Sequence, residues 1–136
     1  MTFETLANTI RGRFDSEIAL NKNLPTQYDN QDKDKPADNI MWCRFTIKEG
    51  QTIRKSIGSP GNNRFRTPGI AIAQIFAPLS QGDKDALQMA DNINQAFRAV
   101  CISGVHFRVP YIKRVGRVDS NYQVNVICEF YADDIG

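Results

Sequence analysis

In two segments, apolar side chains recur at every second position, and this constrains the fold more than any other feature. In YQVNVICEFYA, the alternate positions are Tyr122, Val124, Val126, Cys128 and Phe130. In IMWCRFTI, they are Met41, Cys43, Phe45 and Ile47. Successive side chains of a β-strand point to opposite faces, so each segment predicts a strand with one buried face. Such strands need a second layer that covers the apolar face of their sheet.

Two other segments have helical spacing and can supply that layer. Near the N-terminus, with Thr2 available as N-cap, the apolar positions are Phe3, Leu6, Ala7, Ile10 and Phe14. Within residues 83–100 the corresponding stripe is Leu87, Ala90, Ile93, Ala96, Phe97 and Val100. Asp83 and Asp85 lie in or before the first turn of the second helix, where negative charge suits the helix dipole. We expect both helices to bury their stripes against the sheet.

Turn-forming residues divide the rest of the chain into strands. KEGQ separates IMWCRFTI from TIRKSI, which predicts a hairpin over residues 40–57, and DSN predicts a second hairpin from residues 105–116 and 122–131. PGIAIAQIFAP predicts a strand over residues 69–77, and a short strand is expected around Tyr28. Strands joined by tight turns favour antiparallel pairing. The prediction is an α+β fold, a mainly antiparallel sheet of four to five strands with two helices packed on one face.

The size and composition of the chain fit one domain, residues 1–136. Of its 136 residues, 41% are hydrophobic and 24% are charged, as in ordinary globular proteins. The formal net charge of +2 is too small to indicate nucleic-acid binding by itself. No apolar run approaches the ~20 residues that span a bilayer, and the first residues lack a signal-peptide pattern. We therefore expect synthesis in the cytoplasm and no membrane partner.

A glycine-rich stretch, SIGSPGNNRFRTPG, leads into the predicted strand at residues 69–77. Its composition is like that of phosphate-binding loops. A Walker-type loop needs GxxxxGK[ST] between a strand and a helix. This stretch has no lysine after its glycines, and a predicted strand follows it. Residues 58–67 are therefore predicted to form a mobile loop between strands, with Phe65 as its one large apolar anchor.

No pattern of residues indicates a metal site or a cofactor. Four carboxylates lie close together at Asp29, Asp32, Asp34 and Asp38, but Pro36 occupies the next alternating position and no glycine is present. A calcium loop needs alternating ligands and a central glycine, so a solvated acidic loop is the better interpretation.

Catalytic signatures are also absent from the sequence. The single histidine, His106, falls in an alternating run, and no serine lies in a GxSxG turn. The three cysteines have no close pairing, so Cys43, Cys101 and Cys128 are expected to be reduced and mostly buried. The prediction is a protein that is not an enzyme.

Charge is distributed unevenly along the chain. Basic residues crowd the first predicted hairpin and the following loop, among them Arg54, Lys55, Arg64 and Arg66. Acidic residues gather elsewhere, and the candidates are Asp32, Asp34, Asp83 and Asp85. One interpretation is scattered, solvated charge. The other is a basic and an acidic surface that meet in head-to-tail association, which makes a ring when the contact closes.

The order of segments resembles that of the tail terminator, or tail completion, proteins of long-tailed bacteriophages and prophages. A short opening helix precedes YDN, WCRFTI and a strand-turn-strand pair that ends in SIG. An R-x-x-G step, Arg66 to Gly69, then leads into IAQIFAP, followed by GDKDALQMADNINQAFR and YQVNVICEFYA. The similarity covers nearly the whole chain. The acidic stretch NQDKDKPADN departs from the pattern.

The resemblance implies an α+β fold and a hexameric ring in the virion tail, assembled in the host cytoplasm. Such a ring caps the tail tube, stops polymerisation of the tube protein and presents a surface to head–tail connector proteins, with DNA passing through its lumen. It also implies no catalysis and no cofactor. The loop at residues 58–67 would then become ordered against a neighbouring subunit or the tube. The alternative from the residues is a small basic nucleic-acid-binding module, in which Phe65 between Arg64 and Arg66 stacks on bases.

Overall fold

The computed structural model describes residues 2–31, 36 and 39–135 of the chain. The helical elements are α1 (Phe3–Phe14), a π-helical turn η1 (Asp15–Ala19) and α2 (Lys84–Phe97). The strands are β1 (Thr26–Gln27), β2 (Trp42–Glu49), β3 (Ile53–Arg54), β4 (Arg64–Pro78), β5 (Cys101–Ile102), β6 (Val105–Phe107), β7 (Tyr111–Val118) and β8 (Asn121–Ile135). The predicted α+β class is confirmed.

The strands form one eight-stranded sheet in the order β1-β2-β4-β8-β6-β5, with β3 also paired to β4 and β7 also paired to β8. The first pair, β1 with β2, is parallel, and the other pairs are antiparallel. The predicted count of four to five strands is wrong. The reason is that β4 and β8 are 15 residues long, and each pairs on its outer edge with two shorter strands in succession.

The predicted hairpin over residues 40–57 does not exist. Both β2 and β3 pair with β4, where Glu49 lies opposite Gly69 and Arg54 lies opposite Phe65. Between them the chain stays beside β4, because the Gly50 amide donates to the Pro68 carbonyl at 2.7 Å. The segment KEGQ therefore lets the chain continue along β4 and does not reverse it.

The predicted strand at residues 105–116 is two strands, β6 and β7, with Pro110 between them. Proline has no N–H to donate to a ladder, so pairing is interrupted there. Both strands pair with β8, as the predicted hairpin requires, and β8 contains the alternating segment at residues 122–131.

The hydrophobic core lies between one face of the sheet and both helices. Leu6, Ile10 and Phe14 of α1 and Ile93 and Phe97 of α2 are buried in it. The alternating strand positions meet them: the sheet contributes Cys43, Phe45, Ala71, Ala73, Ile75, Val124, Val126, Cys128 and Phe130. Thr2 caps α1 as expected, since its hydroxyl accepts from the Thr5 amide at 3.0 Å. Phe3, by contrast, is exposed, so the predicted stripe of this helix begins one turn later.

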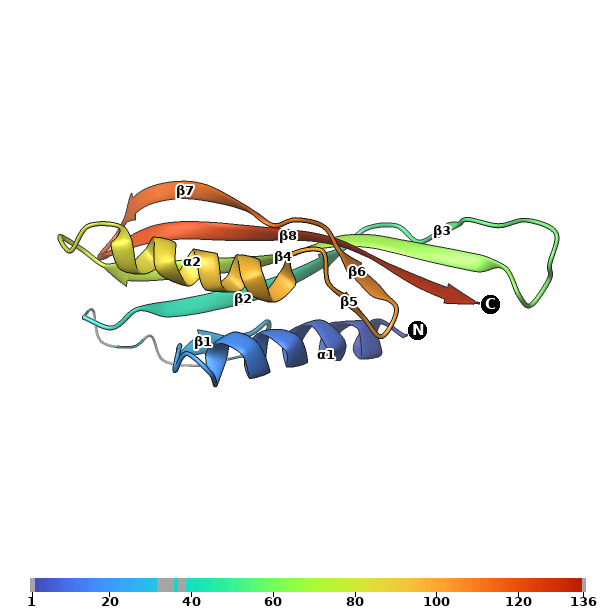
Figure 1. Ribbon diagram of the computed structural model, residues 1–136, viewed down its shortest axis with the longest axis horizontal. Coiled ribbons are helices and arrows are strands. Elements are labelled where there is room, and N and C mark those ends of the chain that lie inside the picture. The colour runs from blue at the N-terminus through green and yellow to red at the C-terminus, as the bar shows by residue number, and fades with distance from the viewer. Residues whose placement is uncertain (1, 32–35, 37–38, 136) are drawn as a thin grey trace.

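The molecule is elongated, and its two regions differ in layers (Figure 1). In one region, the body, α1 and α2 cover the sheet. In the other, β3 and the adjoining ends of β4 and β8 project beyond both helices. We call this projection the arm and define it as residues 53–67 and 132–135.

Candidate functional site

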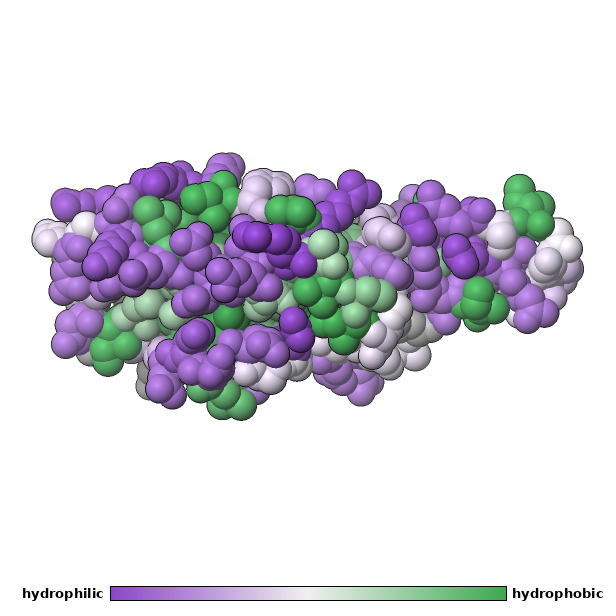
Figure 2. Space-filling model, viewed as in Figure 1, coloured by the Kyte–Doolittle hydropathy of each residue, from purple (hydrophilic) through white to green (hydrophobic). Residues whose placement is uncertain are grey.

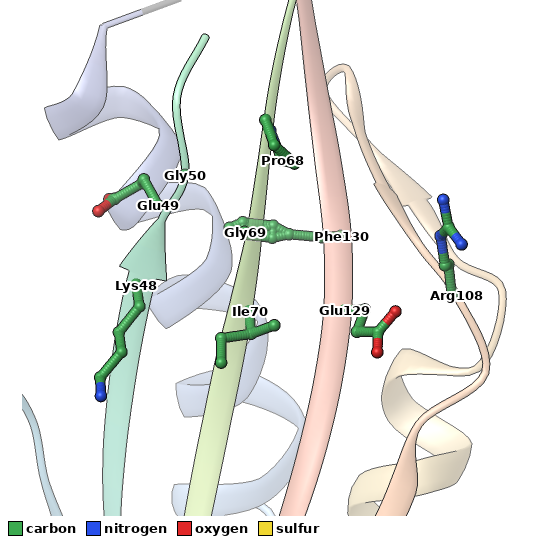
Figure 3. Close-up of a pocket in the computed structure, with 9 residues that line it drawn as sticks. All are labelled: Lys48, Glu49, Gly50, Pro68, Gly69, Ile70, Arg108, Glu129 and Phe130. Atoms are coloured by element: carbon green, nitrogen blue, oxygen red, sulfur yellow. The ribbon is translucent and has the colours of Figure 1, made fainter.

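The arm joins the body at Gly69, a position that has no room for a side chain. Gly69 of β4 lies opposite Phe130 of β8, and the Phe130 ring lies across it (Figure 3). A Cβ on Gly69 would lie 2.5 Å from Cζ of Phe130 and 2.7 Å from the carbonyl oxygen of Lys48. Covering a strand glycine with an aromatic ring from the neighbouring strand is a known way to stabilise such a position. Gly69 therefore marks the boundary between the arm and the body.

A hollow of about 440 Å³ surrounds this junction (Figure 3). Pro68, Gly69, Ile70 and Phe130 form its apolar part. Its charged lining residues are Lys48, Glu49, Arg108 and Glu129. Two positive and two negative groups favour neither an anion nor a cation, so the hollow does not identify a ligand.

The tip of the arm is a connection with internal hydrogen bonds. Asn63 is buried there, and its side-chain oxygen accepts from the Ser59 amide at 3.3 Å. The Ser56 hydroxyl accepts from the Arg64 amide at 2.7 Å. Because β4 begins at Arg64, the predicted loop is wrong for residues 64–67, which are paired with β8. The mobility of residues 58–63 stays a prediction.

The four basic candidates all lie on the arm. Arg54 ends β3, Lys55 follows it, and Arg64 starts β4, and these three side chains are exposed. Within the described ranges, none of the three forms an ion pair. Arg66 differs, because Asp133 of β8 lies opposite it and accepts two hydrogen bonds from its guanidinium, at 2.7 and 2.9 Å.

The Arg66–Asp133 pair is part of a stacked group. The Arg66 guanidinium lies 4.0 Å from the Tyr131 ring centroid, and His106 stacks on Tyr131 with a centroid distance of 4.8 Å. The hydrogen bonds from Arg66, helped by its charge, lower the pKa of Asp133, and those to Asp133 raise the pKa of Arg66. Arg66 therefore adds a side-chain link between the two long strands of the arm, beside their backbone pairing. Sequence reasoning missed this role, because the partners are 67 positions apart and only the strand register brings them together.

The acidic candidates that the structure describes lie at the start of α2. Asp83 accepts a hydrogen bond from Arg114 of β7 at 2.8 Å, and the pKa of Arg114 is raised first by that bond. Asp85 is exposed in the first turn of the helix. Asp32 and Asp34 lie outside the described residues. Arg66 and Asp83 are thus each engaged by a partner inside the subunit.

The basic candidates and the two described acidic candidates, Asp83 and Asp85, lie at opposite ends of the molecule. The arm forms one end, and the N-terminus of α2 lies at the other end of the body (Figure 1). The two groups therefore do not meet within a subunit. The arm points away from the start of α2.

The surface of the arm is mainly hydrophilic, with isolated apolar groups (Figure 2). Ile57 in the tip connection is 84% exposed, and Ile53 and Ile135 are also exposed. Arginine is enriched at protein interfaces, whereas single exposed apolar side chains such as these are common on any protein surface.

The thiols and the histidine do not assemble into a reactive group. Cys43 and Cys128 are buried free thiols, as predicted; burial raises both pKa values, that of Cys128 to about 12. Cys101 is exposed, so the expectation of burial is wrong there, because it lies on β5 at the outer edge of the sheet. Its sulfur is 3.9 Å from Nε2 of His106. Across the described residues, no three His, Cys, Asp or Glu side chains come together in a way that could hold a metal ion.

The chain is an α+β domain with a projecting, charged arm. The chain belongs to the phage tail terminator protein family, whose model matches residues 5–126. The predicted resemblance is thereby confirmed. The family places the protein among the components of the phage tail, and its members have a structural role.

A solved structure with 17% sequence identity has a similar fold, with a TM-score of 0.65 over 93% of this chain and 94% of that one. At this identity the likeness concerns the fold alone. A comparison with curated proteins finds no match. None of the helices that the structure describes has the length and apolar character needed to cross a membrane.

Proposed function

We propose that this protein is the subunit of a closed ring, a hexamer, that caps the phage tail tube. The ring stops polymerisation of the tube protein, offers a surface to the head–tail connector proteins and leaves a lumen for DNA. It acts as a single domain, without catalysis or cofactor, and assembles in the host cytoplasm. Family membership supports the tail role.

The observation that carries the ring is the placement of charge at the two ends of an elongated subunit. Exposed cations on the arm at one end and the exposed carboxylate of Asp85 at the other suit a heterologous contact, in which each copy uses both surfaces and the last copy meets the first. A closed ring leaves no subunit with an unused end. Any further protein must then bind the ring through a surface other than these two ends.

The structure refines which candidate residues suit this contact. Arg54, Lys55 and Arg64 are exposed on the arm, and Asp85 is exposed on α2. Arg66 and Asp83 hold their own subunit together through Asp133 and Arg114. We therefore assign Arg54, Lys55 and Arg64 to the contact and expect them to face Asp85, with Asp32 and Asp34 as further acidic candidates.

The nucleic-acid-binding alternative has less support. A base-stacking residue needs an open ring face beside unpaired cations. Phe65 is only partly exposed, and one of its two neighbouring arginines, Arg66, is already bound to Asp133.

The test is tail assembly in vitro with purified tube protein and the triple variant Arg54→Glu, Lys55→Glu, Arg64→Glu. Charges at the rim of an interface mainly steer association and fix orientation, so the folded variant should fail to terminate tails. We expect tails of excess length and loss of head joining, seen by electron microscopy. The matched control is Lys113→Glu, which changes an exposed cation of β7 away from the arm. Normal tail length and head joining with the folded triple variant would overturn the assignment of the arm.

A further inference from the structure

The face of the sheet opposite the helices carries a polar hollow at the end of the body away from the arm. It has a volume of about 430 Å³. Strands β1, β2, β4 and β8 and the turn between β7 and β8 line it, and the residues used below are Trp42, Arg44, Phe76, Asp119 and Asn121. Because β4 and β8 point Ala73, Ile75, Val124 and Val126 toward the core, the neighbouring positions on each strand point to this second face.

Two residues that line this hollow each carry a buried polar atom with no hydrogen-bond partner among the residues that the structure describes. The indole Nε1 of Trp42 and the side-chain oxygen Oδ1 of Asn121 each lack a hydrogen bond, although the two residues are only 6% and 4% exposed. Buried polar groups in folded proteins nearly always have a partner, and an unsatisfied one destabilises the fold. The residues that line the hollow therefore carry one unused donor and one unused acceptor, both covered by neighbouring atoms in this structure. A peptide group, which has one carbonyl and one N–H, complements them.

Arg44, a cation, lies over the same hollow. Arg44 is exposed, and its guanidinium carbon lies 5.5 Å from the Trp42 ring centroid and 5.7 Å from that of Phe76. No ion pair of Arg44 is found in the described part of the chain. At an exposed site such stacking is a weak attraction, so the Arg44 side chain can move aside when a ligand binds.

The hollow does not suit a nucleic acid. Trp42 and Phe76 stack on each other with centroids 4.4 Å apart, and Arg44 lies over both. Neither ring is exposed enough to receive a base. Asp119, which also lines the hollow, opposes a ligand with many negative charges.

We propose that this hollow binds an extended peptide segment of a partner protein, with one acidic side chain. A main-chain carbonyl accepts from Trp42 Nε1, a main-chain N–H donates to Asn121 Oδ1, and the carboxylate pairs with Arg44. Displacement of the exposed Arg44 side chain opens the way to the indole. The site lies at the same end of the body as Asp83 and Asp85 of the proposed ring contact, but on the face of the sheet opposite the helices.

The test uses the single tryptophan of the chain, which gives one indole N–H signal in a ¹⁵N-correlated NMR spectrum. The probe is the blocked tripeptide acetyl-Gly-Asp-Gly-amide, and the matched neutral probe is acetyl-Gly-Asn-Gly-amide. We expect the aspartate peptide to move the indole signal in a saturable way with a millimolar Kd. Arg44→Gln should weaken binding roughly tenfold or more, the effect of losing a charge-assisted hydrogen bond.

Lys48→Gln is the matched control, because Lys48 is an exposed cation on the same strand and does not line this hollow. It should bind the probe like the wild type. If Arg44→Gln perturbs the fold, Arg44→Lys keeps the charge and should retain part of the binding.

An indole signal that neither peptide moves shows a site filled by water only and overturns the proposal. Equal binding of both peptides overturns the role of the carboxylate. An indole signal that moves with protein concentration alone identifies a second copy as the occupant and overturns the assignment to a partner protein.

Discussion

The body and the arm are made from the same two long strands, but different forces hold them. In the body, β4 and β8 point Ala73, Ile75, Val124 and Val126 into a core that two helices cover. In the arm, the same strands have no helix over them and are joined by backbone pairing and the Arg66–Asp133 ion pair. Burial of apolar surface is the larger stabilising term, so the body determines whether the chain folds.

The difference between the two regions separates stability from assembly. An element with few buried apolar contacts contributes little to global stability, and its surface is open to a partner. Three substitutions test this division, one in the core of the body, one at the junction and one in the arm.

The largest effect is expected from Phe45→Ala in the body. Phe45 is fully buried, and its ring stacks on Phe14 with centroids 4.3 Å apart. Removing a buried aromatic ring leaves a cavity and costs about 3–5 kcal/mol, a large part of the stability of a typical domain. The free energy of unfolding from urea titration measures it. The matched change in the arm is Ile57→Ala, at a residue that is 84% exposed, which should stay within about 0.5 kcal/mol of wild type. Similar losses from the two would show that the arm is part of the core.

An intermediate effect is expected at the junction from Gly69→Ala. The added Cβ would lie 2.5 Å from the Phe130 ring and 2.7 Å from the Lys48 carbonyl. The Phe130 ring is buried and the Lys48 carbonyl belongs to a paired strand, so neither can move aside freely. We therefore expect the free energy of unfolding to fall by about 1–3 kcal/mol. Gly12→Ala is the control. Gly12 is exposed within α1, with nothing within 4 Å of an added Cβ, and alanine there should stabilise by about 1 kcal/mol. Unchanged stability of Gly69→Ala would contradict the tight packing at the junction.

The longer strands and helices of the body could be predicted from the sequence because each shows its own periodicity, whereas the two-residue strand β5 is too short to show any. Phe45 and its alternating neighbours, and the stripe around Ile93, identify a strand and a helix without knowledge of their partners. The arm shows no such local signal. The sequence Arg66-Thr-Pro-Gly69 has the composition of a turn, and only its pairing with β8 makes it a strand.

The candidate site could be predicted in part for the same reason. Charge clusters are visible in a sequence, so the basic residues of the arm were found. The pairing of charges inside the subunit depends on strand register, so the partners of Arg66 and Asp83 could not be predicted. The unpartnered atoms of Trp42 and Asn121 are a property of packing and leave no pattern in the sequence.

The smallest effect is expected from Arg66→Gln, which removes the ion pair of the arm. The hydrogen bonds and charge of Arg66 lower the pKa of Asp133 below its ordinary value of 3.8, with smaller contributions from Arg64 and His106. A carboxyl group with a lowered pKa in the folded state stabilises that state above its ordinary pKa. This contribution is lost as the pH falls below 3.8 and through the lowered value. Because the pair is partly exposed and screened by salt, its loss should loosen the arm and leave the unfolding of the body nearly unchanged.

Titration of the Asp133 carboxyl carbon by NMR measures this directly. In Arg66→Gln, the pKa of Asp133 should rise toward 3.8, and amide exchange should increase in residues 64–67 and 132–135. High salt should shrink the difference between wild type and variant, since exposed charges are screened. Arg114→Gln is the control, because it breaks the other ion pair, with Asp83, and should leave Asp133 unchanged. If Asp133 titrates alike in wild type and Arg66→Gln, the pair does not hold the arm, and backbone pairing alone accounts for its shape.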